Sequence, residues 1–301
     1  DADAGNQRIA EPRRFPVKLY VAYDAQAYYT SNVNLVPSGA SEDYAVVIAN
    51  TLALRGEFRS WAVGDGLLTP SVGFNFQRVY HGVGSDDHKA LDFDAYSVPL
   101  SLRYRFGNNW EASAGFTSTA IYSLEGPPKY HLIFRSYSPS LNLRKLIGLG
   151  ESHLLGLGAG VSYAATTSDR DSASLGAPFA SNPFREDRND KWDFSADAAY
   201  YYLHGKWIVS PYARLTYSDY LHYQESGATV LAPAVPPDAT QVDRRDLTGS
   251  LGLSVSYNFT PWASARVFTS FDWRDSLGDD AFDYGYENTN AGVGLTLSAS
   301  F

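Results

Sequence analysis

Charged side chains recur at every second position within several apolar stretches of this 301-residue sequence. Arg55, Glu57 and Arg59 form one such series, and Arg103 and Arg105 form another. Successive side chains of an extended strand point to opposite faces, so each series gathers its charges on one face. Arginines grouped along the wall of a water-filled pore would favour the passage of anions.

The elements that carry these charges are predicted to be strands, because apolar residues alternate with polar ones along runs of ten or more residues. No apolar run approaches the roughly 18 residues that a membrane helix needs. Twelve runs are predicted, at residues 17–31, 43–62, 67–82, 94–106, 110–124, 130–144, 153–166, 192–203, 207–223, 246–259, 262–275 and 284–301.

The connections between the runs alternate in length. Short ones are predicted at residues 64–66, 107–109, 147–152, 205–206 and 260–261, and long ones at 32–42, 83–93, 125–129, 168–191, 224–245 and 276–283. Short turns at one end and longer loops at the other are typical of outer-membrane barrels. The sequence therefore predicts an all-β, antiparallel, up-and-down transmembrane barrel of 12 strands over residues 17–301, with short periplasmic turns and longer extracellular loops. Residues 1–16 are expected to form a short periplasmic segment.

Aromatic residues support this interpretation by their position. They make up 15% of the chain, and many lie beside the short turns. Aromatic girdles of this kind mark the two membrane interfaces of a barrel. The competing explanation is the aromatic core of a soluble β-sandwich. The residues predicted for the inner girdle are Trp61, Tyr104, Phe106, Trp110, Trp207, Tyr257, Phe259, Trp262 and Phe301.

Two stretches resemble known families. Residues 290–301 alternate apolar and polar positions up to the final Phe301, and they resemble the C-terminal β-signal of Gram-negative outer-membrane barrels. The stretch from Tyr23 to Asn34 is similar to the first strand of the bacterial putative β-barrel porins. These resemblances imply an outer-membrane location, contact with membrane lipid and lipopolysaccharide, and recognition of Phe301 by the barrel-assembly machinery. Other outer-membrane or periplasmic proteins are also candidate partners.

Composition narrows the classes further. Cysteine is absent, which fits an oxidising compartment, and a net charge of -9 argues against nucleic acid as a partner. The chain has no methionine and shows no signal-like apolar segment after Asp1, as expected of a mature form whose export signal has been removed.

Residues on the face opposite the apolar one are predicted to line the lumen. Their charged members are nine basic and six acidic residues, an excess of three positive charges. This arrangement resembles the oligogalacturonate and sialate porins in architecture and charge, and it predicts a passive channel for small hydrophilic solutes with a weak preference for anions. The predicted pore-lining residues are Lys18, Asp24, Arg55, Glu57, Arg59, Arg103, Arg105, Glu111, Arg144, Asp193, Asp197, Arg214, Arg266, Asp272 and Arg274.

The sequence also allows alternatives to an open channel. A narrow barrel can fill its interior with mutually satisfied Arg, Glu and Tyr networks, or the loops at 168–191 and 224–245 can fold inward. Such a closed barrel would anchor a larger complex. An enzyme is not expected. Barrel proteases place catalytic Asp and His residues on opposite sides of the barrel opening, whereas Asp86, Asp87 and His88 lie together in one loop. No cofactor or metal site is expected, although the acidic stretch 275–283 has oxygen ligands that suit Ca²⁺.

Overall fold

The structure is a computed structural model. It describes residues 17–33, 35, 43–82, 88–125, 130–167, 187, 189–222, 224–225, 240–241, 243–278 and 285–301. The predicted N-terminal segment, most of the long loops that were candidate plugs, and Asp86 and Asp87 lie outside the described residues.

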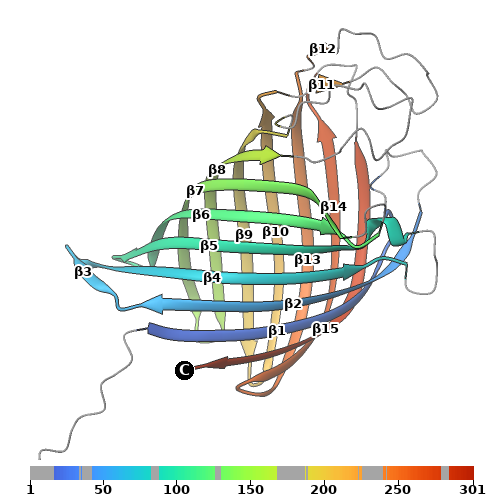
Figure 1. The fold of residues 1–301 in the computed structure, drawn as a ribbon. Helices are drawn as coiled ribbons and strands as arrows, with labels where there is room; N and C mark the ends of the chain where they lie inside the picture. Colours follow the sequence, from blue (N-terminus) through green and yellow to red (C-terminus); the bar gives the residue numbers. More distant parts are fainter. Residues whose placement is uncertain are drawn as a thin grey trace, which may run out of the picture.

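The described residues form the predicted closed barrel of 12 antiparallel strands (Figure 1). Each strand pairs with its neighbours in the sequence, so the topology is up-and-down. Its wall consists of β1 (Val17–Thr30), β2 (Ala45–Phe58), β4 (Gly66–Tyr80), β5 (Phe93–Phe106), β6 (Trp110–Ser123), β7 (His131–Gly150), β8 (His153–Thr167), β9 (Lys191–His204), β10 (Trp207–Tyr220), β13 (Arg245–Thr260), β14 (Ala263–Ser276) and β15 (Tyr286–Ser300). Outside it lie β3 (Trp61–Val63), the pair β11 (Gln224–Glu225) and β12 (Thr240–Gln241), and one 3-10 turn, η1 (Lys89–Leu91).

The barrel closes where the last strand meets the first. Strand β15 pairs with β1 from Tyr20 opposite Ser300 to Thr30 opposite Asn290. The final residue continues this ladder, because the Phe301 N–H donates to the Leu19 carbonyl at 2.9 Å and the Leu19 N–H donates to the Phe301 carbonyl at 3.1 Å. Closure pairs the backbone N–H and C=O groups of both strands, which would be left unpaired at an open sheet edge.

The apolar residues face outward. Leu100, Leu251, Val267 and Val293, on four different strands, are 47%, 50%, 61% and 56% exposed, respectively. Among the described residues, the buried apolar set contains only Ala45, Val47, Ala49, Val79 and Ala164. A soluble sandwich would bury its apolar faces, so this exterior belongs against lipid. Trp207, Trp262 and Phe259 are also exposed and lie beside the short turns, as predicted for the inner girdle.

Two predicted strand boundaries are wrong. The run at 43–62 ends as β2 at Phe58, because its partner β1 begins at Val17, which lies opposite Phe58. Trp61 to Val63 then form β3, which pairs only with β4 and projects beyond the wall (Figure 1). Strand β7 was predicted to end at residue 144, but it continues to Gly150 and turns through residues 151–152.

None of the described helical residues forms a helix long and apolar enough to cross a membrane.

Candidate functional site

Three cavities follow one another along the lumen. A cavity of about 690 Å³ at the periplasmic end is lined by Tyr20, Arg55 and Ser300 among others, and it shares Glu111 and Ser113 with a central cavity of about 830 Å³. The central cavity in turn shares Arg214, Ser250 and Asp272 with a third, of about 360 Å³, whose lining includes Tyr286 and Asn288 near the extracellular ends of β14 and β15. Polar space therefore runs from one end of the barrel toward the other.

Bulk occupies one side of the lumen. Val47, Ala49 and Val79 form a buried cluster on the inner faces of β2 and β4, and Tyr28 and Phe93 pack against it. The central cavity lies along β6 to β10, β13 and β14 instead. The open path is therefore displaced from the barrel axis toward this second wall.

Glycines on the open wall give neighbouring side chains room to lie flat. A Cβ at Gly252 would lie 2.3 Å from the Tyr212 ring, and one at Gly158 would lie 2.4 Å from an Asp197 oxygen. Both inner side chains therefore rest across the backbone of the next strand, where any larger residue would displace them. This arrangement lays both side chains along the wall, so that they line the central cavity without crossing it.

Beside the periplasmic cavity lies a charged cluster centred on Glu57, whose side chain is 14% exposed; Arg55, Arg103 and Glu111 of this cluster line the cavity. The Glu57 carboxylate accepts from Arg103 at 2.9 Å and from the Tyr20 hydroxyl at 3.1 Å, and it lies 3.3 Å from Arg55. A second carboxylate, Glu111, lies 2.8 Å from Arg105. Lys18 and Arg55 both stack on the Tyr20 ring, 4.8 and 4.6 Å from its centroid. Four basic side chains thus surround two acidic ones.

One predicted lumen pair is internally neutral. Arg266 binds Asp24 through two hydrogen bonds of 2.8 Å, and the Thr296 hydroxyl donates to the same carboxylate at 2.6 Å. Gln26 accepts a further bond from Arg266 at 3.2 Å. Two of the charges predicted to line the lumen therefore cancel locally and contribute little field to a passing ion.

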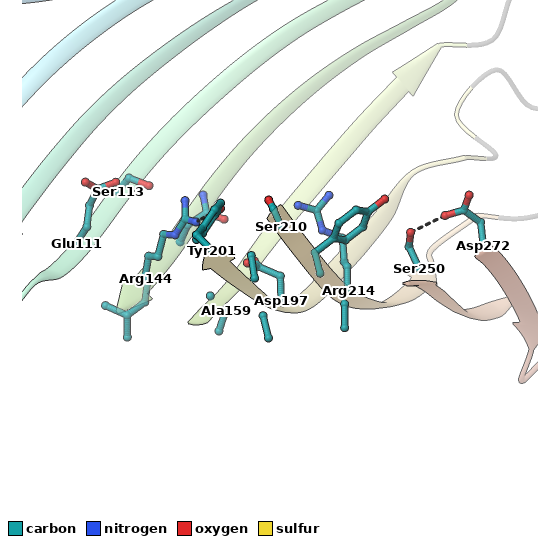
Figure 2. Close-up of a pocket in the computed structure, with 17 residues that line it drawn as sticks. Glu111, Ser113, Arg144, Ala159, Asp197, Tyr201, Ser210, Arg214, Ser250 and Asp272 are labelled. Carbon is teal, nitrogen blue, oxygen red and sulfur yellow. Dashed lines mark hydrogen bonds between the residues drawn. The ribbon is translucent and has the colours of Figure 1, made fainter. Parts of the chain in front are cut away.

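The central cavity holds three charges that do not pair with each other. Arg144, Asp197 and Arg214 point into it from β7, β9 and β10 (Figure 2). Asp197 lies directly across the ladder from Arg214, yet within the described part of the chain neither has a carboxylate or cation within 4.0 Å. Among the residues that the structure describes, Arg144 donates to the Tyr201 hydroxyl alone, at 3.4 Å. Beyond them, Asp272 accepts from Ser250 at 2.5 Å and from Asn290 at 2.8 Å.

The extracellular end contains charged residues that the sequence analysis missed. Asp246, 3% exposed, binds Arg244 at 2.9 Å and the predicted residue Arg274 at 3.1 Å. Lys191 lies 3.0 Å from the predicted residue Asp193. Asp246 is the first residue of the run predicted at 246–259 and was overlooked there, whereas Arg244 and Lys191 lie one or two residues before the predicted runs, on the same inward alternation.

Two anchors hold the described parts of the extracellular loops. Asn288 accepts from the Thr30 hydroxyl at 2.9 Å and from the Asn32 N–H at 3.1 Å, and this turn brings Leu35 into the lining of the outer cavity. The second anchor is His81, whose N–H donates to Asp92 at 2.6 Å. Burial lowers the pKa of His81, and the adjacent Asp92 carboxylate only partly opposes this shift.

The predicted pore residues fall into four groups. Those that line the cavities are Arg55, Arg103, Glu111, Arg144, Asp197, Arg214 and Asp272. Lys18, Glu57 and Arg105 belong to the periplasmic cluster, while Asp24 and Arg266 form the neutral pair. Asp193 and Arg274 lie at the extracellular end. Arg59 is misassigned as a strand residue, because β2 ends one residue before it and leaves it exposed in the connection to β3.

The described residues also bear on metal binding. They contain no cluster of three or more His, Cys, Asp or Glu side chains that could hold a metal ion. Of the acidic stretch at 275–283, residues 279–283 lie outside the described residues. His88, which the sequence analysis set aside as a catalytic residue, lies 2.7 Å from Asp43.

Comparison with known proteins gives similarity at the level of structure. No family model matches the sequence, and no curated protein matches it. An outer membrane channel from Pseudomonas putida F1 is 16% identical, with 99% of this chain and 100% of that chain covered and a TM-score of 0.55. The KdgM porin in complex with disordered oligogalacturonate is 12% identical, covers 92% and 98%, and has a TM-score of 0.41. The NanC porin is 11% identical, covers 91% and 98%, and has a TM-score of 0.44.

The first of these similarities shows a shared fold over nearly the whole of both chains. Together with the exposed apolar exterior and the aromatic girdle, the closed barrel places this protein in the bacterial outer membrane.

Proposed function

We propose that the barrel is a passive channel for small hydrophilic solutes, with a weak preference for anions. The observation that carries this proposal is the succession of three polar cavities that share lining residues from the periplasmic to the extracellular end. A solute that moves through them exchanges its water for polar side chains and never meets the hydrocarbon of the bilayer. The cost of desolvation, which makes a bilayer impermeable to such solutes, is thereby lowered.

The preference for anions is supported by the periplasmic cavity. The cluster beside it contains Lys18, Arg55, Arg103 and Arg105 against Glu57 and Glu111, so it carries two positive charges in excess. Arg55 and Arg105 have side chains that are 49% and 61% exposed, and they therefore reach passing ions. The preference is weak because each of these arginines also faces a carboxylate.

The channel is tested by recording the purified protein in a planar bilayer under a KCl gradient. Steady single-channel conductance with a reversal potential on the chloride side is the expected result. Silence from a barrel that migrates as folded on an unheated gel would overturn the channel and favour a closed barrel that anchors a larger complex.

The anion preference has its own test, the Arg103→Gln, Arg105→Gln double variant. It is expected to lose the chloride preference while conductance persists. The matched control is Lys145→Gln, because Lys145 stacks on Trp110 at 4.9 Å near the same end of the barrel but does not line any of the three cavities. An equal loss in both variants would assign the preference to general surface charge instead of to the lumen.

The partners expected from the sequence belong to the same proposal. The exposed apolar wall would contact the lipid acyl chains, the extracellular rim would contact lipopolysaccharide, and Phe301 would be read by the assembly machinery during insertion. At 77% exposed, the Phe301 residue is accessible for such recognition.

A further inference from the structure

Charges of alternating sign follow one hydrogen-bonding row of the barrel wall. The row runs across the strands from Arg105 to Glu111, Arg144, Gly158, Asp197, Arg214, Ser250, Asp272 and Asn288, each residue opposite the next in the ladder. Arg105 is the penultimate residue of β5 at the periplasmic end, whereas Asn288 is the third residue of β15 at the extracellular end. Because the strands tilt, the row climbs through the lumen.

The middle of this row is the part where opposite charges are kept apart. Asp197 leans across Gly158 toward β8, and this orientation turns its carboxylate away from Arg214 on the other side. Arg144 and Arg214 point into the same cavity from either side of Asp197 (Figure 2). An isolated Asp and Arg on neighbouring strands would ordinarily pair and neutralise each other. Here a positive, a negative and a second positive group remain open to a solute.

We propose that this triad of Arg144, Asp197 and Arg214 is a binding step for small amino acids with a net negative charge. The inference rests on the proposed channel and names a class of solute for it. In such a solute one ammonium group lies beside two carboxylates, so it complements the triad charge for charge. Backbones of adjacent strands lie about 5 Å apart, which separates Asp197 from Arg214 by about 5 Å and from Arg144 by about 10 Å. The flexible arginines can close on a solute of this length, and a cavity of about 830 Å³ holds it with water.

In a channel for simple anions, the Asp197 carboxylate would hinder transport. It would repel every anion at the point where the two arginines attract it, and replacement by Asn would speed all anions alike. In an amino-acid channel the same carboxylate receives the ammonium group. The two interpretations therefore predict opposite effects of one substitution.

The experiment compares uptake of L-glutamate and of glutarate, which lacks only the amino group, into proteoliposomes that contain the full barrel. Asp197→Asn is expected to lower glutamate uptake about threefold, the effect of one solvent-reachable ion pair, and to raise glutarate uptake. Arg214→Gln is expected to lower both. The matched control is Asp219→Asn, which removes one negative charge from the same wall at a residue that does not line the cavity and is expected to leave the ratio of the two solutes unchanged.

A parallel increase of glutamate and glutarate uptake in Asp197→Asn would overturn the binding step. Asp197→Ser, which is smaller and preserves space over Gly158, repeats the test if the Asn variant does not fold. Uptake of uncharged L-arabinose by the unaltered protein separates the two proposals. If arabinose enters, an unchanged glutamate ratio refutes the binding step alone, and if arabinose does not enter, the channel and the binding step both fail.

Discussion

Replacing Glu57 by Gln should make the channel more selective for chloride. Glu57 is one of two carboxylates among the four basic side chains of the periplasmic cluster, so its neutralisation raises the local excess from two positive charges to three. Gln retains an acceptor for the Tyr20 hydroxyl and for one arginine, and the cluster therefore keeps its shape. The expected change in ion selectivity is therefore electrostatic, and its magnitude can be calculated.

The change in the electrostatic energy of an ion is worked out for one unit charge taken at about 8 Å from an ion in the cavity. In water this interaction is worth about 0.5 kcal/mol, and screening at 0.1 M salt reduces it to about 0.2 kcal/mol. Chloride gains this energy and potassium loses it, so the permeability ratio of chloride to potassium should rise about twofold. At 0.01 M salt, where screening is weaker, the rise should be about fourfold.

Reversal potentials measured under KCl gradients at both salt concentrations check this prediction. Glu151→Gln is the control. Glu151 is an exposed carboxylate in the turn between β7 and β8, so its substitution removes one negative charge at the same periplasmic end but outside the lumen. An unchanged ratio at 0.01 M salt, or a change as large in the control, would show that the Glu57 cluster does not face the ion path.

Three further outcomes are expected. Gly252→Ala should lower single-channel conductance because a Cβ there lies 2.3 Å from the Tyr212 ring and drives it off the wall into the cavity, whereas Gly148→Ala, with no atom within 4 Å of its Cβ, should not. Because burial lowers the pKa of His81, protonation of its ring opposes folding, so stability is retained above the ordinary histidine pKa and falls as pH decreases below it. His81→Gln should flatten the decrease in thermal unfolding temperature between pH 7.5 and 5. Phe301→Ala should reduce assembly in cells but not refolding of purified protein into detergent, since the residue is 77% exposed and its hydrogen bonds to β1 are made by the backbone.

The alternation of apolar and polar residues was enough to predict the barrel and the inward face of most strands. A period of two is a local property, so Arg144 or Asp197 can be assigned to a face without knowledge of any partner. The ends of strands were harder to predict, because they depend on the neighbouring strand. Arg59 keeps the alternation of Arg55, yet it lies outside the wall because β1 offers no residue beyond Val17 to pair with it.

Which charges meet could not be predicted, because it depends on the register between strands and on the direction each side chain takes. The sequence shows an excess of three positive charges on the inward face, but a passing ion responds to the charges that remain unpaired. Asp24 and Arg266 are 242 residues apart and cancel each other, whereas Asp197 and Arg214 are direct neighbours and do not. The absence of a side chain at Gly158 lets Asp197 turn away from Arg214, so a glycine on one strand determines the charge that a solute meets on the next. Selectivity of the proposed channel would therefore depend on the register between strands, and a count of charges from composition or alternation would misstate it.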